Sequence, residues 1–137
     1  MIGLHGGTTK EEIVRAALES TAYQVADVLD EMDRVAGDRT EAIKADGGMV
    51  KNGFLMQFLA DITDRTITAA EMEDATAEGV AKAAALCLGD FHRLEDLPDH
   101  SAQSKTYVPG MAAAERSLRM ERWHRAVKRS LGWQCHS

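Results

Sequence analysis

Apolar residues recur every three or four positions in the first third of the chain, which predicts a long amphipathic helix. The positions that carry this pattern are Ile13, Ala17, Leu18, Thr21, Val25, Val28, Leu29 and Met32. Thr8 and Thr9 are each followed by a glutamate three residues later, which is the signature of a capping box at a helix start. Gly37 is expected to end this helix in the C′ position.

Shorter apolar segments alternate with glycine-containing turns through the middle of the chain. Residues 41–45, centred on Ile43, predict a short strand, and residues 66–68 predict a second one. Between them a helix is expected to start near Asn52. Its apolar face would comprise Phe54, Leu55, Phe58, Leu59 and Ile62. A third helix, capped by Asp74 or Thr76, would have its body at residues 80–88 and end at Gly89.

Residues 90–110 contain Pro98 and Pro109 and are expected to be irregular. A last helix is predicted from about Met111 to Ser130. Its apolar face would comprise Leu118, Trp123, Ala126 and Val127. Strands that alternate with helices favour parallel pairing, so the expected fold class is α/β, with a few parallel strands flanked by helices. Two strands make a poor sheet, which indicates that the first strands of a larger sheet are missing.

Length and composition narrow the class of protein. A chain of 137 residues is expected to form a single domain over 1–137, and its 45% of apolar residues argues against wholesale disorder. The net charge of −6 argues against binding to nucleic acid or to an anionic membrane. Two cysteines, Cys87 and Cys135, provide no disulfide framework, so we expect a reducing, cytoplasmic location. The start of the chain lacks the features of a signal peptide.

Charge is unevenly distributed, because residues 112–131 carry six lysines and arginines against two acidic residues. The cations that recur every three residues on the last helix are Arg116, Arg119, Arg122, Arg125 and Lys128. This helix could bind an acidic partner or nucleic acid, but packing over the acidic body of the chain is the favoured interpretation. The acidic residues of the first helix, Asp27, Asp30, Glu31 and Asp33, are interpreted as a solvated face and not as a metal site.

The segment with the clearest chemical potential is Asp46-Gly47-Gly48, which lies just before the helix start at Asn52. Glycine has no Cβ, so a nucleotide could approach the bare backbone at Gly47 and Gly48. The helix N-terminus would add N–H groups that favour negative charge. Asp-Gly is also a strong hairpin signal, so a simple two-strand reversal is the alternative.

Several stretches of the chain match the sequence pattern of a known protein family, and they keep the same register along the chain. They are residues 18–29, Asp46-Gly47-Gly48, Asn52, residues 54–58, Asp61-Ile62, Thr76-Ala77, Gly79, Ala81, Trp123, residues 126–129 and Trp133. On these residues the chain, from Gly3 to Trp133, resembles the C-terminal part of the glycerol kinases. These are carbohydrate kinases with an actin-like (ribonuclease H-like) ATPase fold. Met49 departs from the family pattern, which has a small residue beside the nucleotide.

The resemblance implies ATP-dependent phosphorylation of glycerol to glycerol 3-phosphate, with ATP and Mg²⁺ as cofactors. It places Gly48 and Asn52 in contact with ATP or ADP, with Gly47 as part of the same motif. It assigns no catalytic residue to this chain, because the family's substrate and base residues would precede Gly3. A complementing N-terminal kinase domain is therefore an expected partner. The alternative is a non-catalytic remnant, or a module that binds a nucleotide or a partner.

A further expectation concerns association. If the first strands of the sheet are missing, the strand at residues 41–45 has an unpaired edge. Exposed edges recruit other chains, so we expect a self-associated or marginally stable protein.

Overall fold

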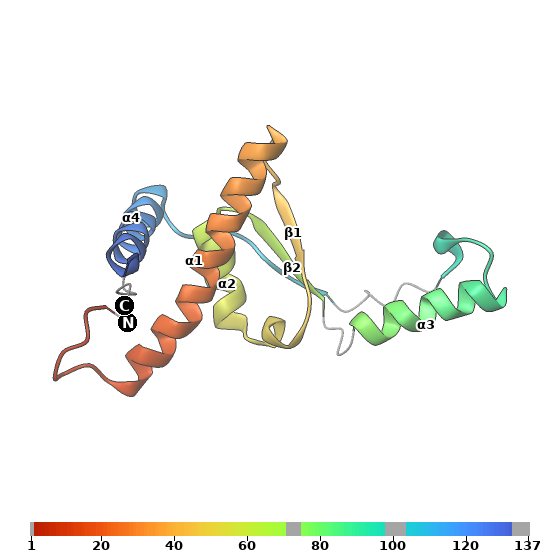
Figure 1. The fold of residues 1–137 in the computed structure, drawn as a ribbon, viewed down its shortest axis with the longest axis horizontal. Helices are drawn as coiled ribbons and strands as arrows, with labels where there is room; N and C mark the ends of the chain where they lie inside the picture. Colours follow the sequence, from red (N-terminus) through yellow and green to blue (C-terminus); the bar gives the residue numbers. More distant parts are fainter. Residues whose placement is uncertain (1, 71–74, 98–103, 133–137) are drawn as a thin grey trace.

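The computed structural model describes residues 2–70, 75–97 and 104–132 and shows three strands with helices before, between and after them (Figure 1). In chain order the elements are α1 (Lys10–Ala36), β1 (Ala42–Ala45), the 3₁₀ turn η1 (Gly48–Lys51), α2 (Gly53–Thr63), β2 (Thr66–Ala70), α3 (Ala75–Leu88), the 3₁₀ turn η2 (Leu94–Asp96), β3 (Ser104–Tyr107) and α4 (Ala113–Ser130). The strand order in the sheet is β1-β2-β3. The α/β class predicted from the alternating pattern is confirmed.

The first two strands pair in parallel, with Ile43 opposite Ile67, and α2 forms the crossover between them. This arrangement confirms the predicted parallel pairing. It also excludes the hairpin interpretation of Asp46-Gly47, because a hairpin would place the next strand antiparallel to β1.

The third strand corrects the expectation that residues 90–110 are irregular. Ser104–Tyr107 pairs antiparallel with β2, and Tyr107 lies opposite Ile67. Four mostly polar residues have no hydrophobic alternation to reveal them. The edge of β2 supplies the backbone hydrogen bonds that make them a strand. The sheet is therefore mixed, and not purely parallel.

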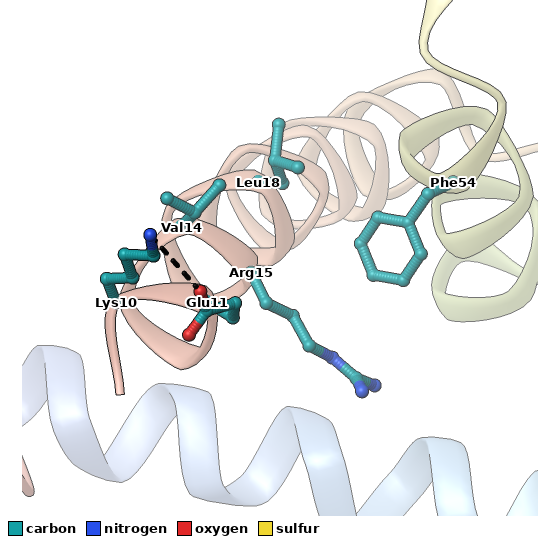
Figure 2. A pocket seen from close by; sticks show the side chains of 6 residues that line it. All are labelled: Lys10, Glu11, Val14, Arg15, Leu18 and Phe54. Carbon is teal, nitrogen blue, oxygen red and sulfur yellow. Dashed lines mark ion pairs between the residues drawn. The ribbon is translucent and has the colours of Figure 1, made fainter. Parts of the chain in front are cut away.

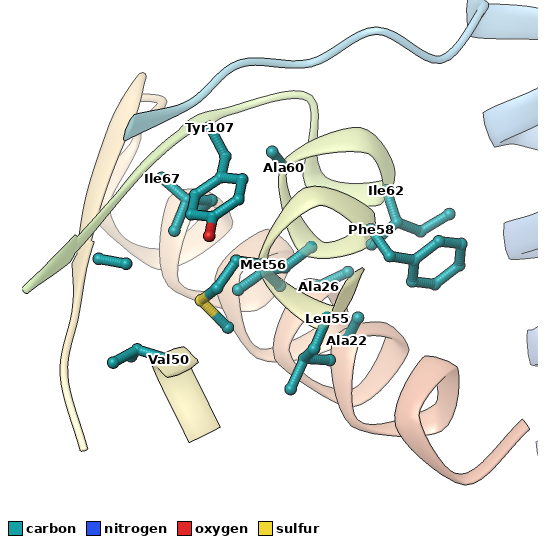
Figure 3. Close-up of a cluster of buried hydrophobic side chains, with 12 residues drawn as sticks. Ala22, Ala26, Val50, Leu55, Met56, Phe58, Ala60, Ile62, Ile67 and Tyr107 are labelled. Atoms are coloured by element: carbon teal, nitrogen blue, oxygen red, sulfur yellow. The ribbon is translucent and has the colours of Figure 1, made fainter. Parts of the chain in front are cut away.

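The core lies between one face of the sheet and α2, with α1 packed across α2 (Figure 3). It comprises Ala22, Ala26, Val50, Leu55, Met56, Phe58, Leu59, Ala60, Ile62, Ile67, Ala69 and Tyr107. Ala22 and Ala26 are the buried residues of α1, and their small side chains let that helix approach α2 closely. Val28 and Met32, which belong to the apolar pattern of the sequence, lie outside the core, since they are 59% and 60% exposed.

Both ends of α1 match the sequence signals. The Thr9 hydroxyl accepts a hydrogen bond from the Glu12 N–H at 3.2 Å, and the Glu12 carboxylate accepts one from the Thr9 N–H at 2.8 Å. This reciprocal pair is the predicted capping box. At the other end Gly37 has φ 75°, a left-handed conformation that glycine adopts without steric cost.

The last helix is held on the body largely by carboxylates. Asp27 of α1 accepts a hydrogen bond from the Trp123 indole N–H at 2.7 Å, and its other oxygen lies 2.8 Å from His124 Nε2. The Trp123 ring stacks on Tyr23 with centroids 5.2 Å apart, and burial raises the pKa of the Tyr23 phenol. Leu118 was predicted on the apolar face, but it is 47% exposed.

Two carboxylates from α2 and its C-cap complete this attachment. Asp61 accepts hydrogen bonds from the backbone N–H groups of Gly110 and Met111, at 2.7 and 3.2 Å, and so fixes the turn before α4. Asp64, the C-cap of α2, pairs with Arg116 at 2.9 Å and with Arg39 at 3.4 Å. Asp64 has φ 55°, and it is the only non-glycine residue with positive φ in the described part of the chain.

The third helix extends away from the sheet and the other helices in Figure 1. Val80 and Leu88 on this helix are 67% and 79% exposed. Gly89 has φ 83°, which fits the predicted helix end. Asp74, one of the two predicted caps, lies outside the described residues.

Candidate functional site

The glycine corner, residues 46–52, follows the C-terminal end of β1 and connects this strand to α2. Gly47 has φ 92° and ψ 178°, a conformation that other residues rarely adopt. The chain then makes the 3₁₀ turn η1, which the sequence did not predict, before Asn52 and α2. Gly47, Gly48 and Asn52 thus lie within one short bend, as the motif required.

The backbone of this bend is open to solvent. A Cβ added at Gly47 or Gly48 would meet no heavy atom within 4 Å. Val50 is buried and anchors the turn to the core, while residues 46–49 are exposed. The corner is therefore neither enclosed by the protein nor part of a hairpin, and a ligand could reach its backbone directly.

Asn52 caps α2, as its position at the helix start predicted. Its side-chain oxygen accepts a hydrogen bond from the Leu55 N–H at 3.1 Å. This bond fixes the orientation of the amide and uses its acceptor, whereas the Nδ2 group donates no hydrogen bond in the cap. Within the described part of the chain, the arrangement leaves the two N–H groups of the Asn52 amide for a ligand.

A separate hollow lies between the N-terminal half of α1 and the start of α2 (Figure 2). It is an open groove of about 430 Å³, lined by Lys10, Glu11, Val14, Arg15, Leu18 and Phe54. The Arg15 guanidinium lies 5.5 Å from the centre of the Phe54 ring. The lining includes none of the predicted site residues, so the groove is distinct from the glycine corner.

Only part of the acidic face predicted on α1 is solvated. Asp27 binds α4, and the carboxylate of Asp33 lies 2.5 Å from Nη2 of the buried Arg65. Among the described residues, no group of three or more histidine, cysteine or acidic side chains is arranged to hold a metal ion. Asp27 and Asp33 therefore attach other elements to α1, whereas Asp30 and Glu31, with 69% and 62% of their side chains exposed, fit the predicted solvated face.

The basic helix divides into two parts. Arg116 pairs with Asp64, and the Arg119 guanidinium lies over the Phe58 ring, so both contact the body of the chain. Arg122, Arg125 and Lys128 are exposed and form no ion pair with other described residues. Among these cations of α4, the favoured interpretation, packing over the body of the chain, holds for Arg116 and Arg119.

No helix within the described ranges combines the length and apolar character needed to cross a membrane.

Comparison with known proteins gives consistent matches. Residues 1–88 match the sequence family described as the FGGY family of carbohydrate kinases, C-terminal domain. Glycerol kinases of Citrobacter koseri and Klebsiella pneumoniae are each 40% identical over 136 residues, which is 99% of this chain and 27% of theirs. The chain thus spans about a quarter of the length of these relatives.

Solved structures agree on the fold. The glycerol kinase of Plasmodium falciparum, solved with ADP, matches 94% of this chain and 26% of its own, with a TM-score of 0.78 and 29% identity. A xylulose kinase from Rhodospirillum rubrum matches with a TM-score of 0.67 at 24% identity, which supports the fold alone. The fold and these matches agree, and we conclude that the chain belongs to the FGGY family of carbohydrate kinases, as a C-terminal domain.

Proposed function

We propose that this chain is the nucleotide-binding side of a kinase that transfers phosphate from ATP to glycerol. The observation that carries the proposal is the corner at residues 46–52, which presents bare backbone to solvent beside the half-buried Asn52, the cap of α2. The chain is similar along nearly its whole length to glycerol kinases, one of which was solved with ADP.

Each residue of the corner has a separate role in this proposal. Gly47 and Gly48 would let the nucleotide approach the backbone, and Asn52 would donate its amide N–H groups to it. Mg²⁺ would arrive bound to the nucleotide phosphates, because Mg²⁺ commonly takes its ligands from phosphates and water with few carboxylates. When bound, ATP supplies the phosphoryl group.

Catalysis by this chain alone is not part of the proposal. Phosphoryl transfer depends on the positioning of the acceptor hydroxyl, the base and the metal around the γ-phosphate. The chain spans 27% of the length of its relatives, and we assign it no catalytic residue. A complementing N-terminal kinase domain would supply the acceptor site, in a reducing cytoplasm.

Titration of the chain with ADP by calorimetry tests the nucleotide site. We expect Gly48→Trp to weaken ADP binding at least tenfold, because the indole would occupy the space above the backbone. Gly48 lacks positive φ and has open space around it, so the substitution should leave the fold intact.

Gly6→Trp is the matched control, since Gly6 is equally open and lies in the N-terminal loop. Equal ADP affinity in all three proteins, or no ADP binding by the unmodified chain, would remove the nucleotide site. Glycerol phosphorylation after addition of an N-terminal kinase domain tests the enzymatic part. ADP binding without restored phosphorylation would favour the alternative, a non-catalytic nucleotide-binding module.

A second proposal concerns association. β1 is an edge strand of the described sheet, with Ala42 and Lys44 exposed. An unpaired strand edge recruits a further strand, so we expect dimers or larger species whose population grows with concentration. Sedimentation velocity over a hundredfold concentration range measures this directly. A single monomeric species throughout would contradict the expectation.

A further inference from the structure

Met49 lies between Gly48 and Asn52 on the short turn η1. The Asn52 N–H donates to the Met49 carbonyl at 3.1 Å, so these two residues are three apart in a 3₁₀ turn. Side chains with this separation lie one above the other in a 3₁₀ helix. We therefore expect the side chain of Met49 to lie on the same side of the turn as that of Asn52, the residue that follows η1.

The exposure of the neighbouring residues supports this direction. Val50 is 6% exposed and packs into the core, whereas Met49 is 50% exposed. A large apolar side chain is thus kept in solvent beside two glycines that leave the backbone bare. Met49 is not among the residues of the core, so a bound ligand could cover its side chain.

We infer that Met49 packs its thioether against the base of the bound nucleotide, an inference that rests on the proposed function. A nucleobase presents a flat, weakly polar face, and methionine adapts its three rotatable bonds and polarizable sulfur to such a surface. The phosphates would instead seek N–H donors, which the thioether lacks. Met49 therefore contributes apolar contact, while Asn52 contributes hydrogen bonds.

If Met49 contacts the base, variants of this residue should change the affinity for ADP. Truncation of Met49 to alanine removes apolar area that ADP would otherwise cover, and we expect affinity for ADP to fall about three- to tenfold. Met49→Leu has similar volume and apolar character, so it should retain most of the affinity. Met32→Ala is the control, because Met32 is similarly exposed, at 60%, and belongs to α1 and not to residues 46–52.

Methyl NMR provides a readout that does not depend on affinity. In a protein labelled at the methionine methyl groups, the signal absent from Met49→Leu identifies Met49 among the seven methionines. Saturation with ADP should shift this signal through the ring current of the base and leave that of Met32 in place.

The possible outcomes distinguish failure of the Met49 contact from failure of the nucleotide site itself. If Gly48→Trp abolishes ADP binding, while Met49→Ala binds normally and the Met49 signal stays unmoved, this inference is overturned and the proposed function stands. If the unmodified chain does not bind ADP, both fail together. A shift of the Met49 signal with reduced affinity of Met49→Ala supports the base contact.

Discussion

Asp33→Ala should lower the free energy of unfolding by about 3 kcal/mol, since removal of one partner from a buried ion pair leaves the other charge uncompensated. Arg65 is only 2% exposed, and its Nε and Nη1 groups are already buried without a hydrogen-bond partner. Its Nη2 group lies 2.5 Å from Asp33. Urea unfolding of the variant and of the unmodified chain at equal concentration measures the difference.

Asp30→Ala is the matched control for this prediction. The Asp30 carboxylate also faces Arg65, but at 3.7 Å and with 69% of the side chain exposed, so its removal should cost less than about 1 kcal/mol. The double variant Asp33→Leu with Arg65→Met should recover most of the lost stability, because no buried charge remains. Equal losses for Asp33→Ala and Asp30→Ala would refute the assigned role of Asp33.

Ile67→Ala should destabilise the chain by about 3 kcal/mol through a cavity in the middle of the core. Ile67 has no exposed surface and lies on the central strand, between Ile43 on β1 and Tyr107 on β3. These two neighbours are fixed in separate strands and can close the cavity only in part. The urea midpoint should fall accordingly, with the slope of the transition unchanged.

Thr68→Ala provides the comparison at the next position of the same strand. Thr68 points to the opposite face of the sheet, because successive side chains of a strand alternate. It is partly exposed, and we expect its replacement to change stability by less than about 1 kcal/mol. A loss as large as that of Ile67→Ala would show that the two faces of the sheet are not packed differently.

Much of the fold could be predicted because its signals are local. The Thr9 capping box, Gly37 and Asn52 each mark a helix end through hydrogen bonds or backbone conformation within a few residues. The alternation of these helices with short strands then favoured parallel pairing, which β1 and β2 confirm. The position of the glycine corner followed from the same local pattern, while its role in nucleotide binding stays a prediction.

The missed features depend on partners far away in the sequence. β3 exists because β2 offers it an edge, and its own four residues carry no strand periodicity. Ala22 and Ala26 are only weakly hydrophobic and so contribute little to the apolar pattern of the sequence. Their small size nevertheless lets α1 pack closely against α2. The pairing of Asp33 with Arg65 joins residues 32 positions apart, so a charge pattern along one helix could not reveal it.

Asp64 carries a backbone conformation that costs an ordinary residue about 1–2 kcal/mol, and aspartate tolerates it better than most. Glycine would remove this strain, but it would also remove the carboxylate that joins Arg39 and Arg116. The effect of any substitution at position 64 on stability thus depends on Arg39, before β1, and on Arg116, on α4. Substitutions at these three positions should be epistatic, and a lineage would have to change them in a constrained order.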